Sequence, residues 1–148
     1  MKNRLTIAIQ KNGRLSDQSR DLIKKSGINF TAKGDKLLAK SNNLPIDILF
    51  VRSDDIPSLV SNGDADMAIV GENILIEKTL FKKTNINKVL ELGFSKCRLS
   101  FAAPQNFSMK SVKNKKIATS YPNTVKKYLL DNKITANVVN IHGSVELT

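Results

Sequence analysis

The sequence predicts an α/β fold built on a largely parallel sheet, and two observations carry this prediction. First, short apolar runs rich in β-branched residues occur at Leu5–Gln10, Ile46–Val51 and Ala65–Val70, and such runs are typical of buried strands. Second, each run is followed by a segment with helix-start residues and helical spacing of apolar side chains. Strands that alternate with helices in this way favour a parallel sheet with helical crossovers.

The helices are predicted from their start and stop residues. The first is expected to begin with Ser16 as its N-cap and to stop at Gly27, which suits a helix C-terminus. The second is expected to be capped by Asp54 or Asp55, with Pro57 in its first turn. A third helix should follow Gly71 and Glu72 and run through Leu80. Between the first two strand–helix units, Phe30–Ala32 and Lys36–Ala39 are expected to form a hairpin around Gly34-Asp35.

The second part of the chain continues this strand–helix logic. Strands are predicted at Val89–Leu92, Arg98–Ala102, Lys116–Thr119 and Val138–Ile141, with a helix over Thr124–Asn132. The polar, Lys-rich stretch 105–116 is expected to form a loop with a short helix. A lobe boundary is predicted near residues 93–96, which gives a first lobe over 1–94 and a second over 95–148.

Composition limits the classes of partner and compartment. The chain has 24 Lys and Arg against 13 Asp and Glu, a net charge of +11, which suits phosphorylated small molecules, nucleic acid or anionic lipid. Of the 24 cationic residues 19 are Lys, and the chain also has 15 Asn. This enrichment favours coding bias over a polyanionic partner, so the five Arg are more informative than the many Lys. The single Cys97 excludes an internal disulfide, and the single His142 excludes a histidine cluster. No apolar run approaches the ~18 residues of a membrane span, so a cytoplasmic protein without a membrane partner is expected.

Candidate site residues follow the strands, because ligands of open α/β sheets bind beyond the carboxyl ends of the strands. The first such loop contains Lys11, Gly13 and Arg14. A helix N-terminus attracts anions, glycine permits close backbone approach, and arginine binds phosphate with two parallel hydrogen bonds. The simpler alternative is a pair of solvated cations.

The other strand ends carry residues of mixed chemistry, each with a structural alternative. Arg52 could bind an anion, or it could form a local ion pair. Glu72 could accept a hydrogen bond from a ribose or adenine donor, or it could be an acid that stabilises a helix N-terminus. Thr119, Ser120 and Tyr121 suit a phosphate or base, or simply a turn. A weak anion cradle is predicted further on at Gly143 and Ser144.

Taken in order, several motifs together resemble the amino-terminal part of the long form of the ATP phosphoribosyltransferase family. They are IAIQKNGRLSDQSRDLI, PIDILFVRSDDIPSLVSNGDADMAIVGENIL, CRLSFAAP, KIATSYPNTVKKYL and GSVE. The resemblance implies a fold similar to type II periplasmic binding proteins, with two α/β lobes and the active site in the cleft. Here the second lobe is expected to be incomplete.

The resemblance also implies the chemistry of the first step of histidine biosynthesis. N1 of the adenine of ATP attacks C1 of phosphoribosyl pyrophosphate (PRPP), which yields phosphoribosyl-ATP and pyrophosphate with substrate-bound Mg²⁺. Arg14 and Arg52 are expected to act on the leaving pyrophosphate. The remaining substrate-binding residues are expected to be Lys11, Gly13, Glu72, Thr119, Ser120, Tyr121, Gly143, Ser144 and Glu146. No protein metal ligand is expected, and the family works as a homo-oligomer, a hexamer.

The chain departs from the family's pattern at its end. In the family, GSVE leads to a helix and then a loop resembling D-x-V-x-T-G-x-T-L that holds the 5-phosphate and ribose of PRPP, whereas this sequence stops at Thr148. We therefore expect an inactive fragment without histidine feedback. Two other functions stay open: a non-catalytic anion- or solute-binding lobe, and nucleic-acid binding driven by charge. Against the second, aromatic residues are only 5% and no recognition motif is found.

Overall fold

The computed structural model describes residues 4–32 and 36–141. The chain divides into two compact units, Met1–Cys97 and Arg98–Thr148, and each is described by itself. Among the described residues, no helix is both long and apolar enough to cross a membrane.

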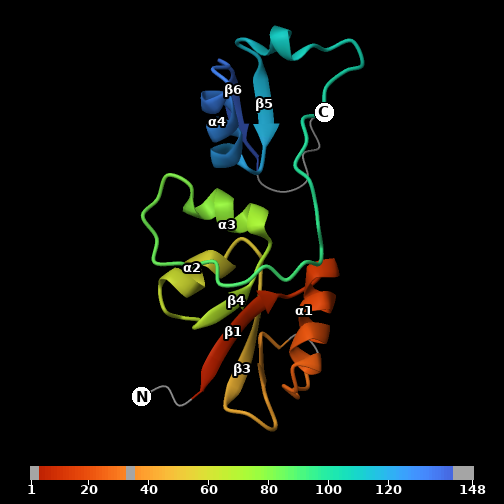
Figure 1. Ribbon diagram of the computed structural model, residues 1–148, viewed down its shortest axis with the longest axis vertical. Helices are drawn as coiled ribbons and strands as arrows, with labels where there is room; N and C mark the ends of the chain where they lie inside the picture. Colours follow the sequence, from red (N-terminus) through yellow and green to blue (C-terminus); the bar gives the residue numbers. More distant parts are fainter. Residues whose placement is uncertain (1–3, 33–35, 142–148) are drawn as a thin grey trace. The chain divides into compact units, whose positions relative to one another are not determined.

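The first unit is built on a mixed sheet of four strands (Figure 1). In chain order the strands are β1 (Leu5–Gln10), β2 (Leu38–Lys40), β3 (Ile46–Val51) and β4 (Met67–Ile69), and they lie in the order β2-β3-β1-β4. The central strand β1 is parallel to both β3 and β4, and only β2, at the edge, is antiparallel to its neighbour β3. The predicted α/β class with a largely parallel sheet is confirmed.

Helices cover both faces of this sheet, as the alternation of side chains along a strand requires. The helix α1 (Arg14–Lys25) lies on one face, where its Ile23 packs with Ile9 and Phe50. On the other face α2 (Ile56–Ser61) packs Ile56 against Ala8, the residue beside Ile9 on β1. The third helix, α3 (Glu72–Thr79), packs against α2. Both faces of β1 are therefore buried, which explains its unbroken apolar sequence.

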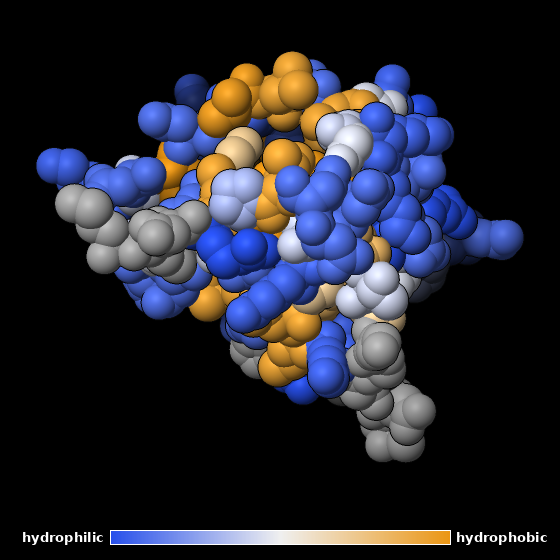
Figure 2. All heavy atoms as spheres, turned by 90° about the horizontal axis from the view of Figure 1, so that it is seen from below, coloured by the Kyte–Doolittle hydropathy of each residue, from blue (hydrophilic) through white to orange (hydrophobic). Residues whose placement is uncertain are grey.

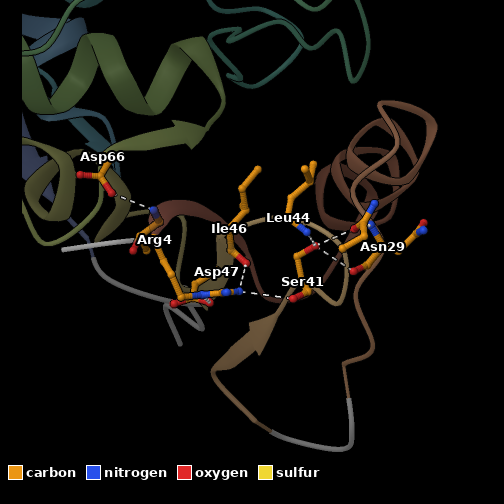
Figure 3. Close-up of polar contacts among 9 residues, drawn as sticks. Arg4, Asn29, Ser41, Leu44, Ile46, Asp47 and Asp66 are labelled. Carbon is orange, nitrogen blue, oxygen red and sulfur yellow. Dashed lines mark hydrogen bonds and ion pairs between the residues drawn. The ribbon is translucent and has the colours of Figure 1, made fainter.

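The register of the strands is fixed at their amino ends by side chains in the strands or directly before them (Figure 3). Arg4 donates to Asp47 Oδ1 at 2.8 Å and to the carbonyl of Ile46 at 2.8 Å, which ties the start of β1 to the start of β3. On the other side of β1, the Thr6 N–H donates to Asp66 Oδ2 at 2.7 Å. Since a parallel sheet shifted by one residue would turn its buried face outward, these contacts also align the opposite ends of the strands.

Two local predictions in this unit are wrong. Ser16 is not the N-cap, because α1 already begins at Arg14, and Gly13 is the cap residue. The hairpin over residues 30–39 is also not formed as expected: Phe30 makes a single bridge to Ser41, and β2 begins at Leu38 and pairs with β3 instead. The predicted turn at Gly34-Asp35 lies outside the described residues.

The second unit contains a strand–helix–strand motif. Its strands β5 (Lys116–Thr119) and β6 (Asn137–Asn140) are parallel, and α4 (Pro122–Asp131) connects them. A short 3₁₀ helix, Met109–Val112, precedes them. In the described part of the second unit, the buried apolar residues are Val112, Val125 and Leu129. The predicted strands and helix of residues 116–141 are confirmed, with ends shifted by one or two residues.

The strands predicted at Val89–Leu92 and Arg98–Ala102 are wrong, because the structure assigns no strand between residues 80 and 115. Val89 is 84% exposed and Leu90 is 73% exposed. A strand requires hydrogen bonds from a neighbouring strand, and none of the strands in the described part of the chain pairs with these segments. Figure 2 shows the underside of the molecule, where hydrophobic atoms remain exposed among largely hydrophilic ones.

Candidate functional site

The register of β1 brings three strand-end loops to one edge of the sheet in the first unit. Gln10 at the end of β1 lies beside Val51 at the end of β3, and Ile9 lies beside Ile69 at the end of β4. The next residues therefore start their loops together, and the Lys11 N–H still donates to the Val51 carbonyl at 2.8 Å. The loops that hold Lys11, Arg52 and Glu72 meet at this edge, as the strand order requires.

The loop after β1 turns sharply at Gly13 before α1 starts. Gly13 has φ 95° and ψ 176°, a conformation that only glycine adopts readily. As the cap residue it has no side chain to bond the first N–H groups of α1. Those groups have no partner within the helix, and together with the helix dipole they favour an anion at this end.

The carbonyl groups of the same loop accept hydrogen bonds from the protein. Gln10 Nε2 donates to the Asn12 carbonyl at 2.6 Å, and the Asp17 N–H donates to the Gly13 carbonyl at 3.2 Å. The Lys11 carbonyl accepts from Ser16 Oγ at 2.9 Å. With its carbonyl oxygens engaged, the loop repels an anion less than a free loop would.

Two arginines stand at this edge with exposed side chains. Arg14 is the first residue of α1, and Arg52 directly follows β3. Lys11 is half-buried, precedes Arg14 in the same loop, and is bonded through its N–H to Val51, the residue before Arg52. The edge thus combines a helix N-terminus with three cationic side chains, an arrangement suited to a polyanion such as a di- or triphosphate.

Glu72 contributes an acid to the same edge, and a lysine from further along the chain pairs with it. Glu72 is the first residue of α3, and Lys88 Nζ lies 2.8 Å from its Oε1 and 2.6 Å from Oε1 of Glu91. Lys88 donates hydrogen bonds to both carboxylates, and the one to Glu72, followed by the one to Glu91, raises the pKa of Lys88. In return, the hydrogen bond from Lys88 lowers the pKa of Glu91. Since all three groups are exposed, the pair orders the loop only weakly.

The second unit holds its own group of predicted site residues. Thr119 ends β5, Ser120 follows it, and Tyr121 is the N-cap residue of α4. The turn is closed by the Tyr121 N–H, which donates to Thr119 Oγ1 at 3.0 Å, and the Ile141 N–H donates to the Thr119 carbonyl at 3.0 Å. The hydroxyl of Thr119 therefore shapes the turn. The predicted residues Gly143, Ser144 and Glu146, and also His142, lie outside the described residues.

In the part of the chain that the structure describes, no three His, Cys, Asp or Glu side chains are placed to hold a metal ion. Cys97 is exposed and has a free thiol.

Sequence reasoning missed two side chains at this edge, Arg20 and Lys88. Arg20 contacts the loop after β1 from within α1: its Nη2 donates to the Lys11 carbonyl at 3.2 Å and its Nε to Ser16 Oγ at 3.1 Å. The signal was present, because Arg20 is one of only five arginines and lies four residues after Ser16 on the same helix face. Nothing in the sequence connects Lys88 to Glu72.

Comparison with known proteins identifies the family to which the chain is similar. The family model described as ATP phosphoribosyltransferase matches residues 52–148. An ATP phosphoribosyltransferase from Cytophaga hutchinsonii is 45% identical over 146 residues, which cover 97% of this chain and 50% of that protein. The chain thus spans about half the length of this curated relative.

A solved structure shows the same fold. It is the ATP phosphoribosyl transferase (HisG:HisZ) complex from Thermotoga maritima, with a TM-score of 0.70 and 24% sequence identity over 97% of this chain and 67% of that chain. The motifs along the sequence, the fold and the two sequence matches agree: this chain belongs to the ATP phosphoribosyltransferase family.

Proposed function

We propose that this chain supplies part of the active site of an ATP phosphoribosyltransferase, the enzyme of the first step of histidine biosynthesis. In the proposed reaction, a bond forms between N1 of the adenine of ATP and C1 of PRPP, while the bond from C1 to the pyrophosphate oxygen breaks. The observation that carries this proposal, beside family membership, is the meeting of Lys11, Arg14 and Arg52 at one sheet edge, beside the start of α1.

The proposed role of the cations follows from where charge develops. Pyrophosphate leaves with the electron pair of the C1–O bond, so cations and N–H groups placed around it lower the barrier. Arg14 and Arg52 are assigned to this role, with Lys11 and the backbone of Gly13 beside a phosphate. Adenine N1 is unprotonated near neutral pH, so the attack requires positioning rather than a strong general base.

The remaining residues are proposed to hold the substrates. Glu72 releases its contact with Lys88 and accepts a hydrogen bond from a ribose hydroxyl or the adenine amine instead. Thr119, Ser120 and Tyr121 bind phosphate or the base. The sequence-based assignment of Gly143, Ser144 and Glu146 to the substrates is retained as part of the proposal.

The proposal extends to fold and assembly. We propose two lobes, over residues 1–94 and 95–148, in a fold like that of type II periplasmic binding proteins, a fold whose members bind their substrates in a cleft. Mg²⁺ arrives bound to the polyphosphates of ATP and PRPP. We propose cytoplasmic action as a homo-oligomer, a hexamer in the full-length family. The Thermotoga maritima neighbour is itself described as a complex, which supports association.

Binding is the direct test. MgATP and PRPP are titrated separately into the ¹⁵N-labelled chain, and the amide signals of residues 11–14, 52 and 72 are followed. Both ligands should shift these signals, whereas adenosine, which lacks the phosphates, should leave residues 11–14 unmoved. Amide signals at this edge that respond to neither ligand would overturn the proposal. Formation of phosphoribosyl-ATP, followed by mass spectrometry, extends the test to turnover.

A further inference from the structure

We propose that Arg20 is a positioning residue for the anion site at the loop after β1. It holds the Lys11 carbonyl toward the body of the first unit, so that the loop presents N–H groups and cations to the ligand. The identity of that ligand, a pyrophosphate group, rests on the function proposed above. The positioning role itself rests on contacts within the protein.

Arg20 connects three elements through one guanidinium group. Its Cζ lies 4.1 Å from the centroid of the Phe50 ring on β3. From that position, Nη2 donates to the Lys11 carbonyl at 3.2 Å and Nε donates to Ser16 Oγ at 3.1 Å. Ser16 Oγ in turn donates to the same Lys11 carbonyl at 2.9 Å. The Arg20 guanidinium thus joins strand β3, helix α1 and the loop.

The anchor of this arrangement is rigid. The Phe50 side chain is 1% exposed and Ser16 is also 1% exposed, and the Phe50 ring packs against Phe30 with centroids 6.2 Å apart. The Lys11 N–H donates to the Val51 carbonyl, the residue after Phe50. Both polar groups of the Lys11 backbone are therefore held by or through the end of β3.

The geometry requires arginine rather than any cation. A planar guanidinium can lie on an aromatic ring and still direct N–H groups from its edge to two acceptors. A lysine ammonium at this position keeps the charge but has no flat face and no fixed fork. The consequence for the site is electrostatic: a freed Lys11 carbonyl could turn toward the ligand, where its oxygen would repel a phosphate.

The experiment compares Arg20→Lys and Arg20→Gln with Lys24→Gln as a matched control. Lys24 lies on the same helix, over Phe30, the ring that packs against Phe50, with Nζ 5.8 Å from the Phe30 centroid. The substitution Lys24→Gln therefore removes the same charge from this face of the helix but leaves the contacts of Arg20 with the loop intact. Two quantities are measured: the hydrogen exchange of the Asn12 and Gly13 amides without ligand, and the dissociation constant of magnesium pyrophosphate.

Both Arg20 variants should speed amide exchange in the loop. They should weaken pyrophosphate binding about tenfold, because the Lys11 carbonyl loses the charged hydrogen bond that keeps it turned away from the phosphate. Lys24→Gln should leave both quantities unchanged. If Arg20→Lys behaves like the unmodified chain while Arg20→Gln does not, the residue supplies charge only and the proposal is overturned. Unchanged behaviour in both variants overturns it as well.

Two further measurements keep the outcomes separate. If the unmodified chain does not bind pyrophosphate, the proposed function fails, but the exchange of Asn12 and Gly13 still decides whether Arg20 orders the loop. If the Arg20 variants do not fold, Ser16→Ala replaces them, since it removes the second donor to the Lys11 carbonyl without disturbing Phe50. Ser16→Ala should also speed exchange at Asn12 and Gly13, and unchanged rates would contradict the role of this carbonyl.

Discussion

At the scale of single residues, the informative side chains are arginines with distinct tasks. Arg4 fixes the start of β1 against β3, Arg20 fixes the loop at its end, and Arg14 and Arg52 stand exposed at the proposed anion site. Lysine is far more abundant in this chain, and most lysines in the part that the structure describes are exposed. The fork of the guanidinium explains the difference, because it can bond two acceptors in a fixed geometry.

Replacing Arg14 by glutamine tests its proposed role. The variant should bind MgATP or magnesium pyrophosphate about tenfold more weakly, because it loses a charged donor to phosphate. Lys25→Gln is the control: Lys25 lies at the other end of α1 and pairs with Asp21 at 2.7 Å. Isothermal titration calorimetry of both variants gives the comparison. Equal affinities for Arg14→Gln and Lys25→Gln would show that only overall charge matters.

The Lys88 contacts predict a measurable titration. Because Lys88 donates to Glu91, the pKa of Glu91 lies below its usual 4.5. The pair contributes stability above that ordinary value and loses it as the pH falls through the lowered pKa of Glu91. An NMR titration of the Glu91 carboxyl should therefore show a low midpoint, which returns toward 4.5 in Lys88→Gln. A midpoint that does not move in that variant would mean that Lys88 is not the cause.

At the scale of elements, the junction between β1 and α1 depends on Gly13. Its φ of 95° and ψ of 176° suit glycine alone, and an added Cβ would lie 3.3 Å from Gln10 Nε2. Gly13→Ala should therefore lower the free energy of unfolding by roughly 1–3 kcal/mol. Gly27→Asn is the control, since Gly27 has φ 81° with nothing within 4 Å of its added Cβ, and asparagine tolerates this conformation. Urea denaturation of both variants makes the comparison, and a smaller loss in Gly13→Ala would contradict the assignment.

The same junction shows why sequence patterns locate elements better than their ends. Ser16 is a favoured N-cap residue, yet in the structure it lies inside α1 and its hydroxyl bonds the Lys11 carbonyl. The positive φ of Gly13 allows the helix to begin earlier, and a glycine in a loop gives no advance sign of its dihedral angles. Likewise Val89–Leu92 has the composition of a strand, but composition cannot supply the neighbouring strand that would pair with it.

At the scale of the whole molecule, each unit has its own buried residues. In the first unit they lie on both faces of the sheet, with Ile9, Ile48 and Phe50 on the α1 face. In the described part of the second unit the buried apolar residues are fewer: Val112, Val125 and Leu129. The first unit is therefore expected to unfold as one cooperative body around its central strand.

A core substitution tests this expectation. Ile48 is 0% exposed, so Ile48→Ala should cost about 2–5 kcal/mol through lost burial and an unfilled cavity. Native-state hydrogen exchange should show the loss throughout β1, β3 and β4 together. Leu37→Ala is the control, since Leu37 is 56% exposed, and it should cost less than about 0.5 kcal/mol. Protection lost in β3 alone would contradict a single cooperative body.

The sequence was sufficient for the fold class and for the edge of the sheet where the cations gather. Three apolar runs alternating with helix signals define a parallel sheet, and parallel strands place Lys11, Arg52 and Glu72 at one edge. The sequence marks Arg20 as one of five arginines on the helix face of Ser16, but it does not specify which distant groups Arg20 or Lys88 contacts. The bond from Arg20 to Lys11 depends on how α1 packs over Phe50, and the pair of Lys88 with Glu72 depends on the path of an irregular segment.

The central position of β1 has a consequence for how the sheet forms while the chain is being synthesised. β1 is synthesised before both of the strands that flank it in the sheet: Leu5 pairs with Ile46, and Ile7 pairs with Met67. Until then, its apolar residues have no sheet to join, and a long stretch of chain must close before either pairing forms, which slows folding. An unpaired strand edge of this kind favours aggregation. The strand that leads into the proposed anion site is therefore made before both of its partners and can pair only after they have been synthesised.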